Sequence, residues 1–156
     1  MGSVAILWTI GHSNRTPVKF LGILRAHGIR LVVDVRRIPH SRFNPQFNRR
    51  ALEKSLHQTK ILYRHAEDLG GRRPQRRDSS NTGLAEGALR GYADHMETPI
   101  FQEALRMLKE RGREQPTAVL CAEADPARCH RSLLADALAA QGMEVRHIVS
   151  FRQGCV

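Results

Sequence analysis

The chain has 156 residues, of which 41% are apolar and 26% are charged. This length and composition fit an ordinary globular protein, so we expect a single domain over residues 1–156 and exclude global disorder. No apolar run approaches the roughly 20 residues that cross a bilayer, and the first residues lack the basic start of a signal peptide. We therefore expect a cytoplasmic protein with no membrane partner.

The charge balance is strongly basic. Lysine and arginine total 25 and aspartate and glutamate total 15, which gives a formal net charge of +10. A GC-rich genome would explain why arginine outnumbers lysine, but it would not explain the excess of cations over anions. The excess favours a polyanionic partner, and we expect a nucleic acid or a nucleotide.

The first part of the chain predicts a strand, a helix and a second strand. Residues 4–10 form an apolar run with β-branched members, which is typical of a buried strand. Thr16 and Pro17 are a helix cap and a first-turn proline, and helical spacing continues to Gly28. Residues 31–35 form a second apolar run. Short connections between such elements indicate a parallel crossover.

The alternation of predicted strands and helices continues to the end of the chain. We expect a surface loop over 36–48, helices over 49–58, 84–96 and 99–111, strands over 61–63, 117–121 and 145–149, and a last helix that opens at Asp125 and Pro126. Residues 70–83 combine glycine, proline and arginine, which indicates a mobile basic loop. The predicted fold is a single three-layer α/β domain, with a mainly parallel sheet of four or five strands and helices on both faces.

Polar and reactive side chains gather where the predicted strands end. They are His12, Ser13, Asp34, Arg36, Cys121 and Glu123. Because the carboxyl ends of parallel strands meet at one edge of a sheet, we expect a binding site at that edge. An ordinary turn is the alternative interpretation of His12 and Ser13, and a structural ion pair is the alternative for Asp34 and Arg36.

Residues 121–131 contain the highest density of reactive and charged side chains in the chain. Glu123 follows a strand, and His130 and Arg131 stand in the first turns of the expected helix. A helix N-terminus with nearby cations can hold an anion, and Glu123 is then a candidate general acid or base.

The three cysteines, Cys121, Cys129 and Cys155, contain no Cys-x-x-Cys pair, so neither a disulfide scaffold nor a zinc knuckle is expected. Cys129 is better explained as a packed thiol than as a nucleophile, and both interpretations of Cys121 stay open. A metal site formed by Cys121, Cys129, His130 and His12 is possible in principle, but its spacing is not diagnostic. We expect no metal and no cofactor.

Four arginines in the predicted basic loop are candidates for phosphate contacts with a nucleic acid. They are Arg72, Arg73, Arg76 and Arg77. The alternative is that these arginines are simply solvated on a surface loop and contact no nucleic acid.

The same segments resemble a known family. The motifs are Thr9-Ile10-Gly11-His12-Ser13, residues 31–36 with Pro39 and Ser41, Leu69-Gly70-Gly71, Leu120-Cys121-Ala122-Glu123 with Pro126, and Cys129-His130-Arg131. Their order and spacing are similar to the family catalogued as domain of unknown function 488, over about residues 8–148. The resemblance singles out these polar positions as the site, and it implies no reaction.

We predict an enzyme that acts on a phosphate-bearing nucleotide or nucleic acid, by hydrolysis of an N-glycosidic or phosphoester bond. The expected catalytic residues are Asp34 or Glu123 to activate water and His12 or His130 to move a proton; the expected ligand-binding residues are Ser13, Arg36, Ser41, Arg131, Cys121 and Cys129. Hydrolysis is favoured over redox chemistry because no dinucleotide-binding glycine motif is present. The alternatives are a non-catalytic nucleic-acid-binding module and a thiol or sulfur-transfer protein that uses Cys121 or Cys129.

Overall fold

The structure, a computed structural model, describes residues 5–84, 87–125 and 129–149. Its strands are β1 (Ile6–Gly11), β2 (Leu31–Asp34), β3 (Leu62–His65), β4 (Thr117–Cys121) and β5 (Glu144–Ile148). They form one sheet in the order β3-β2-β4-β1-β5, and every neighbouring pair is parallel. All the described strands therefore end at the same edge.

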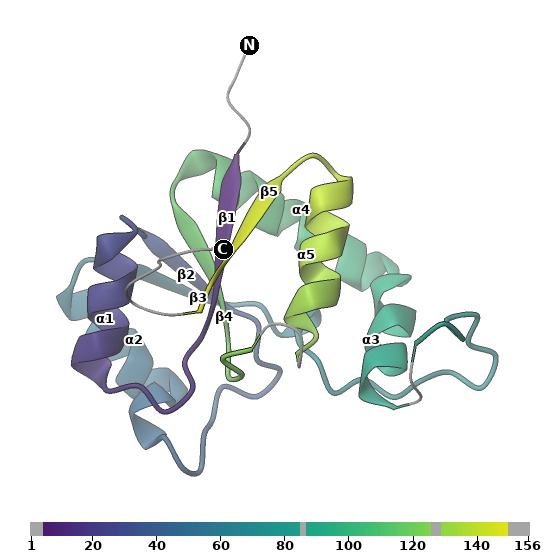
Figure 1. Cartoon of the computed structure of the whole chain (residues 1–156), viewed down its shortest axis with the longest axis horizontal. Helices are drawn as coiled ribbons and strands as arrows, with labels where there is room; N and C mark the ends of the chain where they lie inside the picture. The colour runs from purple at the N-terminus through teal and green to yellow at the C-terminus, as the bar shows by residue number, and fades with distance from the viewer. Residues whose placement is uncertain (1–4, 85–86, 126–128, 150–156) are drawn as a thin grey trace.

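Helices cover both faces of the sheet, as Figure 1 shows. The helices are α1 (Pro17–Ala26), α2 (Arg49–Gln58), α3 (Ala88–Met96), α4 (Pro99–Glu114) and α5 (Arg131–Ala140), with short 3-10 turns η1 (Pro45–Phe47) and η2 (Glu67–Leu69). Helices α1 and α2 bury Phe20 and Leu52 against one face, and α4 and α5 bury Leu105 and Leu138 against the other. Each fully buried side chain of this size contributes about 1.5–3 kcal/mol. The predicted three-layer α/β domain is confirmed.

Two threonine-proline pairs start helices as their chemistry requires. The Thr16 hydroxyl accepts from the Lys19 amide at 3.2 Å, and the Thr98 hydroxyl accepts from the Phe101 amide at 3.2 Å. Each cap satisfies a backbone N–H that the helix itself leaves without a partner.

Two helices begin later than predicted. Helix α3 begins at Ala88 instead of residue 84, directly after Gly87, whose φ of +99° is not helical. Helix α5 begins at Arg131, beyond the expected start at Asp125 and Pro126. Residues 85–86 and 126–128, and also Val4 of the first predicted strand, lie outside the described residues. Of the described helices, none is long and apolar enough to cross a membrane.

The basic loop over 70–83 has no helix or strand, and the buried carboxylate of Asp94 on α3 holds part of it. Asp94 accepts from the Arg76 amide at 2.7 Å, the Ser79 hydroxyl at 2.6 Å and the Asn81 side-chain amide at 2.7 Å. Three such bonds to one carboxylate tie residues 76–81 to the helix. The mobility expected from composition stays a prediction.

Candidate functional site

The chain segments that follow β1 and β4 are joined by backbone hydrogen bonds at the carboxyl edge of the sheet. The amide of His12 donates to the Cys121 carbonyl, and the amide of Ser13 donates to the Ala122 carbonyl, each at 2.9 Å. Gly11 permits this approach, because a Cβ atom there would lie 1.8 Å from the Glu123 carbonyl oxygen. The first histidine and residues 121–123 therefore share one edge.

Asp34 and Arg36 form a buried ion pair at the end of β2. The Arg36 Nε and Nη2 atoms donate to the two Asp34 oxygens at 2.9 and 2.7 Å, and the Arg36 amide donates to Oδ1 at 3.1 Å. The Tyr63 hydroxyl, on β3, donates to Oδ2 at 2.6 Å, and burial together with Asp34 raises the Tyr63 pKa. Both carboxylate oxygens thus accept hydrogen bonds within the protein, and Asp34 fixes the position of Arg36; the predicted catalytic role of Asp34 stays a prediction.

The buried imidazole of His12 has a defined tautomer. Its Nδ1 lies 2.8 Å from the Ser13 carbonyl oxygen, and because a carbonyl only accepts, Nδ1 carries the proton. The ring stacks on Phe47, with centroids 4.5 Å apart. Burial, assisted by the charge of Arg36, lowers the His12 pKa below 6.5 despite the Ser13 bond. The neutral ring therefore presents a bare lone pair on Nε2, which has no hydrogen-bond partner among the described residues.

Two buried arginines retain unused donors at the same edge. Arg131, at the start of α5, is fully buried and donates through Nη2 to the carbonyls of Glu123 and Ala124, at 3.0 and 3.1 Å. In the described part of the chain, the Arg131 Nε and Nη1 atoms and the Arg36 Nη1 atom have no partner. Buried N–H groups on a cation are costly without an acceptor, so these positions favour an anionic ligand.

Cys121 and Cys129 lie in contact, with their sulfur atoms 3.2 Å apart. The hydrogen bond with Cys121 lowers the Cys129 pKa, and the nearby His130 ring, 3.5 Å from Cys129 Sγ, acts in the same direction. The partner thiol and burial raise the pKa of Cys121. Within the pair, the pKa is therefore raised for the buried Cys121 thiol and lowered for the half-buried Cys129 thiol.

A family model described as "Domain of unknown function DUF488" matches residues 16–138, which is most of the chain. The chain belongs to this family. The resemblance seen in the sequence motifs is thereby confirmed, and the Gly11-His12-Ser13 motif lies just before the matched range. No match is found among curated proteins, and none among solved structures.

In this DUF488 domain, two glycines of the Leu69-Gly70-Gly71 motif allow close packing at the site. A Cβ atom on Gly70 would lie 2.7 Å from the Arg37 amide nitrogen, and one on Gly71 would lie 2.7 Å from Nδ1 of His130. The His130 ring also packs on Tyr92, with centroids 4.8 Å apart. The motif therefore fixes the place of the histidine between two chain segments.

Three predicted site residues of the DUF488 domain lie apart from the buried donors. The Glu123 side chain is exposed and accepts from the Asp125 amide at 3.2 Å. The Ser13 hydroxyl donates to Asn14 Oδ1 at 3.5 Å. Ser41 organises its own loop, since its hydroxyl accepts from the Asn44 amide at 3.0 Å. Their predicted roles in catalysis and binding stay predictions.

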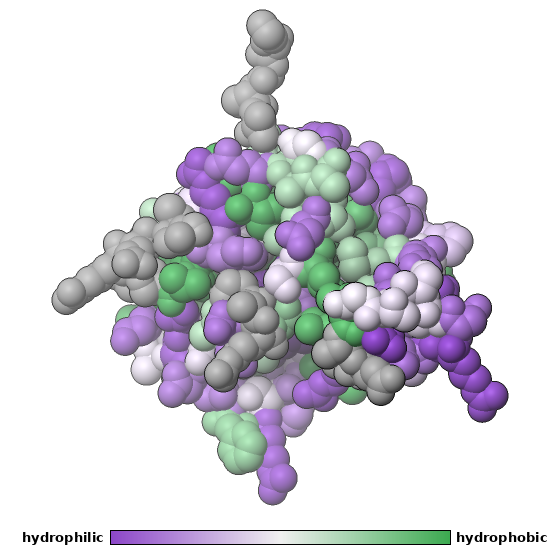
Figure 2. All heavy atoms as spheres, turned by 45° about the vertical axis from the view of Figure 1, so that its right-hand side comes forward, coloured by the Kyte–Doolittle hydropathy of each residue, from purple (hydrophilic) through white to green (hydrophobic). Residues whose placement is uncertain are grey.

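The four arginines of the basic loop have different environments. Arg73 donates to the carbonyls of Gly70 and Glu67, and Arg76 pairs with Glu97 at 2.6 Å. Arg72 and Arg77 are exposed. Figure 2 shows hydrophilic and hydrophobic side chains intermixed on the face that it presents. Two of the four predicted phosphate ligands are therefore already engaged within the protein, and their predicted role is not tested by these contacts.

Sequence reasoning missed three residues that position the site. Tyr63 completes the Asp34 pair, Phe47 stacks on His12, and the Nε2 atom of His65 lies 2.7 Å from the Arg36 carbonyl oxygen. The pairing of β2 with β3 would have indicated that His65 lies beside the Asp34 pair, because Asp34 and His65 are register partners in these strands. Sequence alone does not give that pairing.

The described residues gather no group of three or more His, Cys, Asp or Glu side chains that could hold a metal ion. The four residues considered for a metal site, Cys121, Cys129, His130 and His12, thus do not form such a group.

The larger of two described hollows, about 660 Å³, is lined by Trp8, His27 and Pro116 among others. It lies at the opposite edge of the sheet, where β1 and β4 begin.

Proposed function

We propose that this DUF488 domain is a hydrolase that cleaves an N-glycosidic or phosphoester bond in a phosphate-bearing nucleotide or nucleic acid. One observation carries the proposal: the bare Nε2 of neutral His12 lies within electrostatic range of Arg36, which has an unused N–H. A base beside a fixed cation is the arrangement that activates water next to a bound anion.

Each group then has a separate role. Arg36, held by Asp34, and Arg131 donate N–H groups to the phosphate. His12 Nε2 accepts a proton from water as the water oxygen bonds to the reacting phosphorus or carbon, and the leaving group departs with the electrons of the broken bond. Both oxygens of Asp34 accept hydrogen bonds within the protein and the Glu123 side chain is exposed, so the proposal gives His12 the role of base that the sequence analysis predicted for Asp34 or Glu123.

The surface beside the site supports a nucleic-acid or nucleotide substrate. Phe43 is 85% exposed, and the Arg42 guanidinium lies 5.8 Å from its ring centroid. An exposed ring with an adjacent cation can stack on a base and contact a phosphate. The loop that carries Phe43 also supplies Phe47, which covers His12, so substrate binding requires this loop to move.

A hydrolysis assay with matched histidine variants tests the proposal. Nucleoside monophosphates and single-stranded and duplex oligonucleotides are incubated with the protein, and free base, nucleoside and phosphate are separated by chromatography. We expect turnover by the native chain and a loss of about 100-fold or more in His12→Asn. Because the His12 pKa lies below 6.5, the rate should fall only as the pH drops below that value. His57→Asn, on the exposed side of α2, is the control and should retain full activity.

Some outcomes would contradict the roles assigned here, and others would contradict the function itself. Equal activity of His12→Asn and the native chain would show that His12 is not the base. Loss of turnover with retained binding in Glu123→Gln would assign the role of base to Glu123. Salt-dependent binding of oligonucleotides without any product would instead favour the non-catalytic nucleic-acid-binding module. The thiol or sulfur-transfer alternative requires that alkylation of the thiols at neutral pH abolishes the activity.

We place the activity in the cytoplasm, as the composition led us to expect.

A further inference from the structure

We propose that Cys129 and Cys121 are a redox-active dithiol, in which a hydroperoxide oxidises Cys129 and Cys121 then closes a reversible disulfide. Both cysteines are free, and their sulfur atoms are 3.2 Å apart. Two sulfur atoms in contact need only a small movement to bond. The proposal does not depend on the hydrolase function, since the steps proposed above for His12, Arg36 and Arg131 use neither sulfur atom.

The surroundings of Cys129 are those of a reactive thiolate. Its Sγ accepts from the Arg131 amide at 3.5 Å at the start of the ten-residue helix α5, and it lies 3.5 Å from His130 Nδ1. Helix N-termini and imidazole donors both favour the thiolate. His130 and Arg131 affect the pKa values of the two cysteines, which also affect each other. Cys129 in turn affects the pKa values of Tyr92 and His147.

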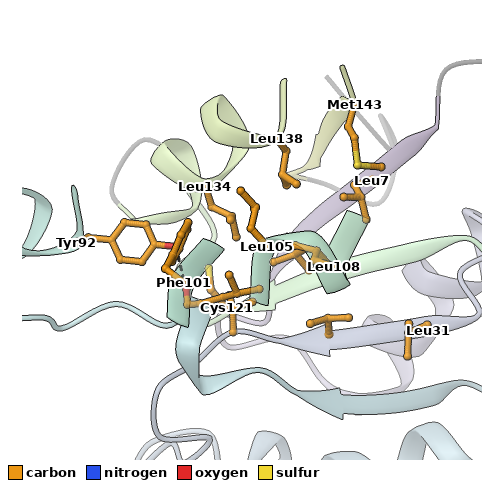
Figure 3. Packing of buried hydrophobic residues seen from close by; sticks show 14 residues of the cluster. Leu7, Leu31, Tyr92, Phe101, Leu105, Leu108, Cys121, Leu134, Leu138 and Met143 are labelled. Carbon is orange, nitrogen blue, oxygen red and sulfur yellow. Dashed lines mark hydrogen bonds between the residues drawn. The ribbon is translucent and has the colours of Figure 1, made fainter. Parts of the chain in front are cut away.

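The two thiols differ in access, which separates their roles. Cys129 is half-buried and Cys121 is 1% exposed. Figure 3 shows Cys121 at the end of the apolar cluster where Tyr92 and Phe101 lie, with Leu7 and Met143 at the other end. Cys129 is only partly buried and packs against this cluster. Cys129 is therefore the thiol that meets the oxidant, and Cys121 is the one that resolves it.

The oxidation balances in two steps. The Cys129 thiolate attacks the OH oxygen of the peroxide, so that an S–O bond forms and the O–O bond breaks; sulfur becomes a sulfenic acid, and the departing alkoxide or hydroxide takes a proton from solvent to give an alcohol or water. The Cys121 sulfur then attacks the Cys129 sulfur. An S–S bond forms, the S–O bond breaks, and the hydroxide leaves with the thiol proton as water. An added dithiol reverses the change.

The sequence offers a direct assay for the disulfide. Arg113, Arg128 and Arg131 place Cys121 and Cys129 on different tryptic peptides, residues 114–128 and 129–131. After brief exposure of the folded native chain to hydrogen peroxide, we expect these peptides to be joined in mass spectra and to separate again after dithiothreitol. The Cys155→Ser variant is the control and should give the same linked pair. Failure to find the linked pair would overturn the proposal.

Variants and a pH profile test the division of roles. In Cys121→Ser, the sulfenic acid on Cys129 should persist and be trapped by dimedone, whereas in Cys129→Ser no sulfenic acid should form on Cys121. The alkylation rate of Cys129 should stay nearly constant from pH 9 to pH 6, because the contacts with Cys121 and His130 lower its pKa from 9.0 to about 4. An ordinary thiol would lose about tenfold per pH unit. Such a tenfold loss, or trapping on Cys121 alone, would contradict the assignment.

Discussion

The Asp34→Asn variant should lose about 3–5 kcal/mol of unfolding free energy, the usual cost of breaking a buried ion pair by removing one partner. Asp34 is fully buried and accepts two bonds from the Arg36 guanidinium and one from the Tyr63 hydroxyl. An amide keeps one acceptor oxygen and has no charge, so the Arg36 cation would remain buried without a counter-ion. Urea unfolding at neutral pH measures the loss.

A surface carboxylate provides the matched control for this variant. Glu103 pairs with Arg106 at 2.6 Å on α4, where both side chains are more than half exposed. Exposed pairs contribute about 0–1 kcal/mol, so Glu103→Gln should unfold close to the native midpoint. If Asp34→Asn matched Glu103→Gln to within about 1 kcal/mol, the buried pair would not be what holds Arg36 in place.

The Gly11→Ala variant should be destabilised by about 3 kcal/mol or more, at the upper end of overpacking costs. The new Cβ atom would lie 1.8 Å from the Glu123 carbonyl oxygen and 2.8 Å from the Ala124 amide nitrogen. Both are backbone atoms, so the loop after β4 must move away from β1. That movement would break the bond from Ser13 to Ala122 and the Arg131 contacts with the same loop.

Thermal unfolding of Gly11→Ala, followed by circular dichroism, measures this effect, and Gly83→Ala is its control. A Cβ atom on Gly83 would meet nothing within 4 Å, so that variant should change the unfolding free energy by less than about 1 kcal/mol. Equal stability of the two variants would show that β1 and the loop after β4 are not in close contact, and would separate His12 from residues 121–124.

The strands and their common edge could be predicted because buried parallel strands are short apolar runs. Residues 31–35 and 117–121 have no other reasonable interpretation, and β2 and β4 do run side by side within the sheet. The sequence could not give the sheet order, because the pairing of β2 with β4 joins segments about 80 residues apart along the chain. The partners that depend on this order, such as Tyr63 beside Asp34, could not be found either.

The candidate site could be predicted by residue type and only partly by role. Asp34 and Arg36 are two residues apart on a strand and its extension, so their pairing was foreseeable, but the further hydrogen bond from Tyr63 to Asp34 follows from three-dimensional contacts. Cys129 was interpreted as a packed thiol from helical spacing that begins at Asp125. Cys129 does pack against the buried cluster, as predicted, although α5 begins later, at Arg131, and the Cys129 sulfur also contacts the Cys121 sulfur.

Nitrogen NMR of the His12 imidazole tests the central claim most directly. With labelled protein at pH 7, we predict a proton on Nδ1, none on Nε2, and a midpoint of titration below 6.5. Adding a nucleoside monophosphate or a short oligonucleotide should shift the Nε2 signal. A protonated Nε2 at pH 7, or a signal that no nucleotide changes at saturating concentration, would contradict the account of this edge as a hydrolytic site.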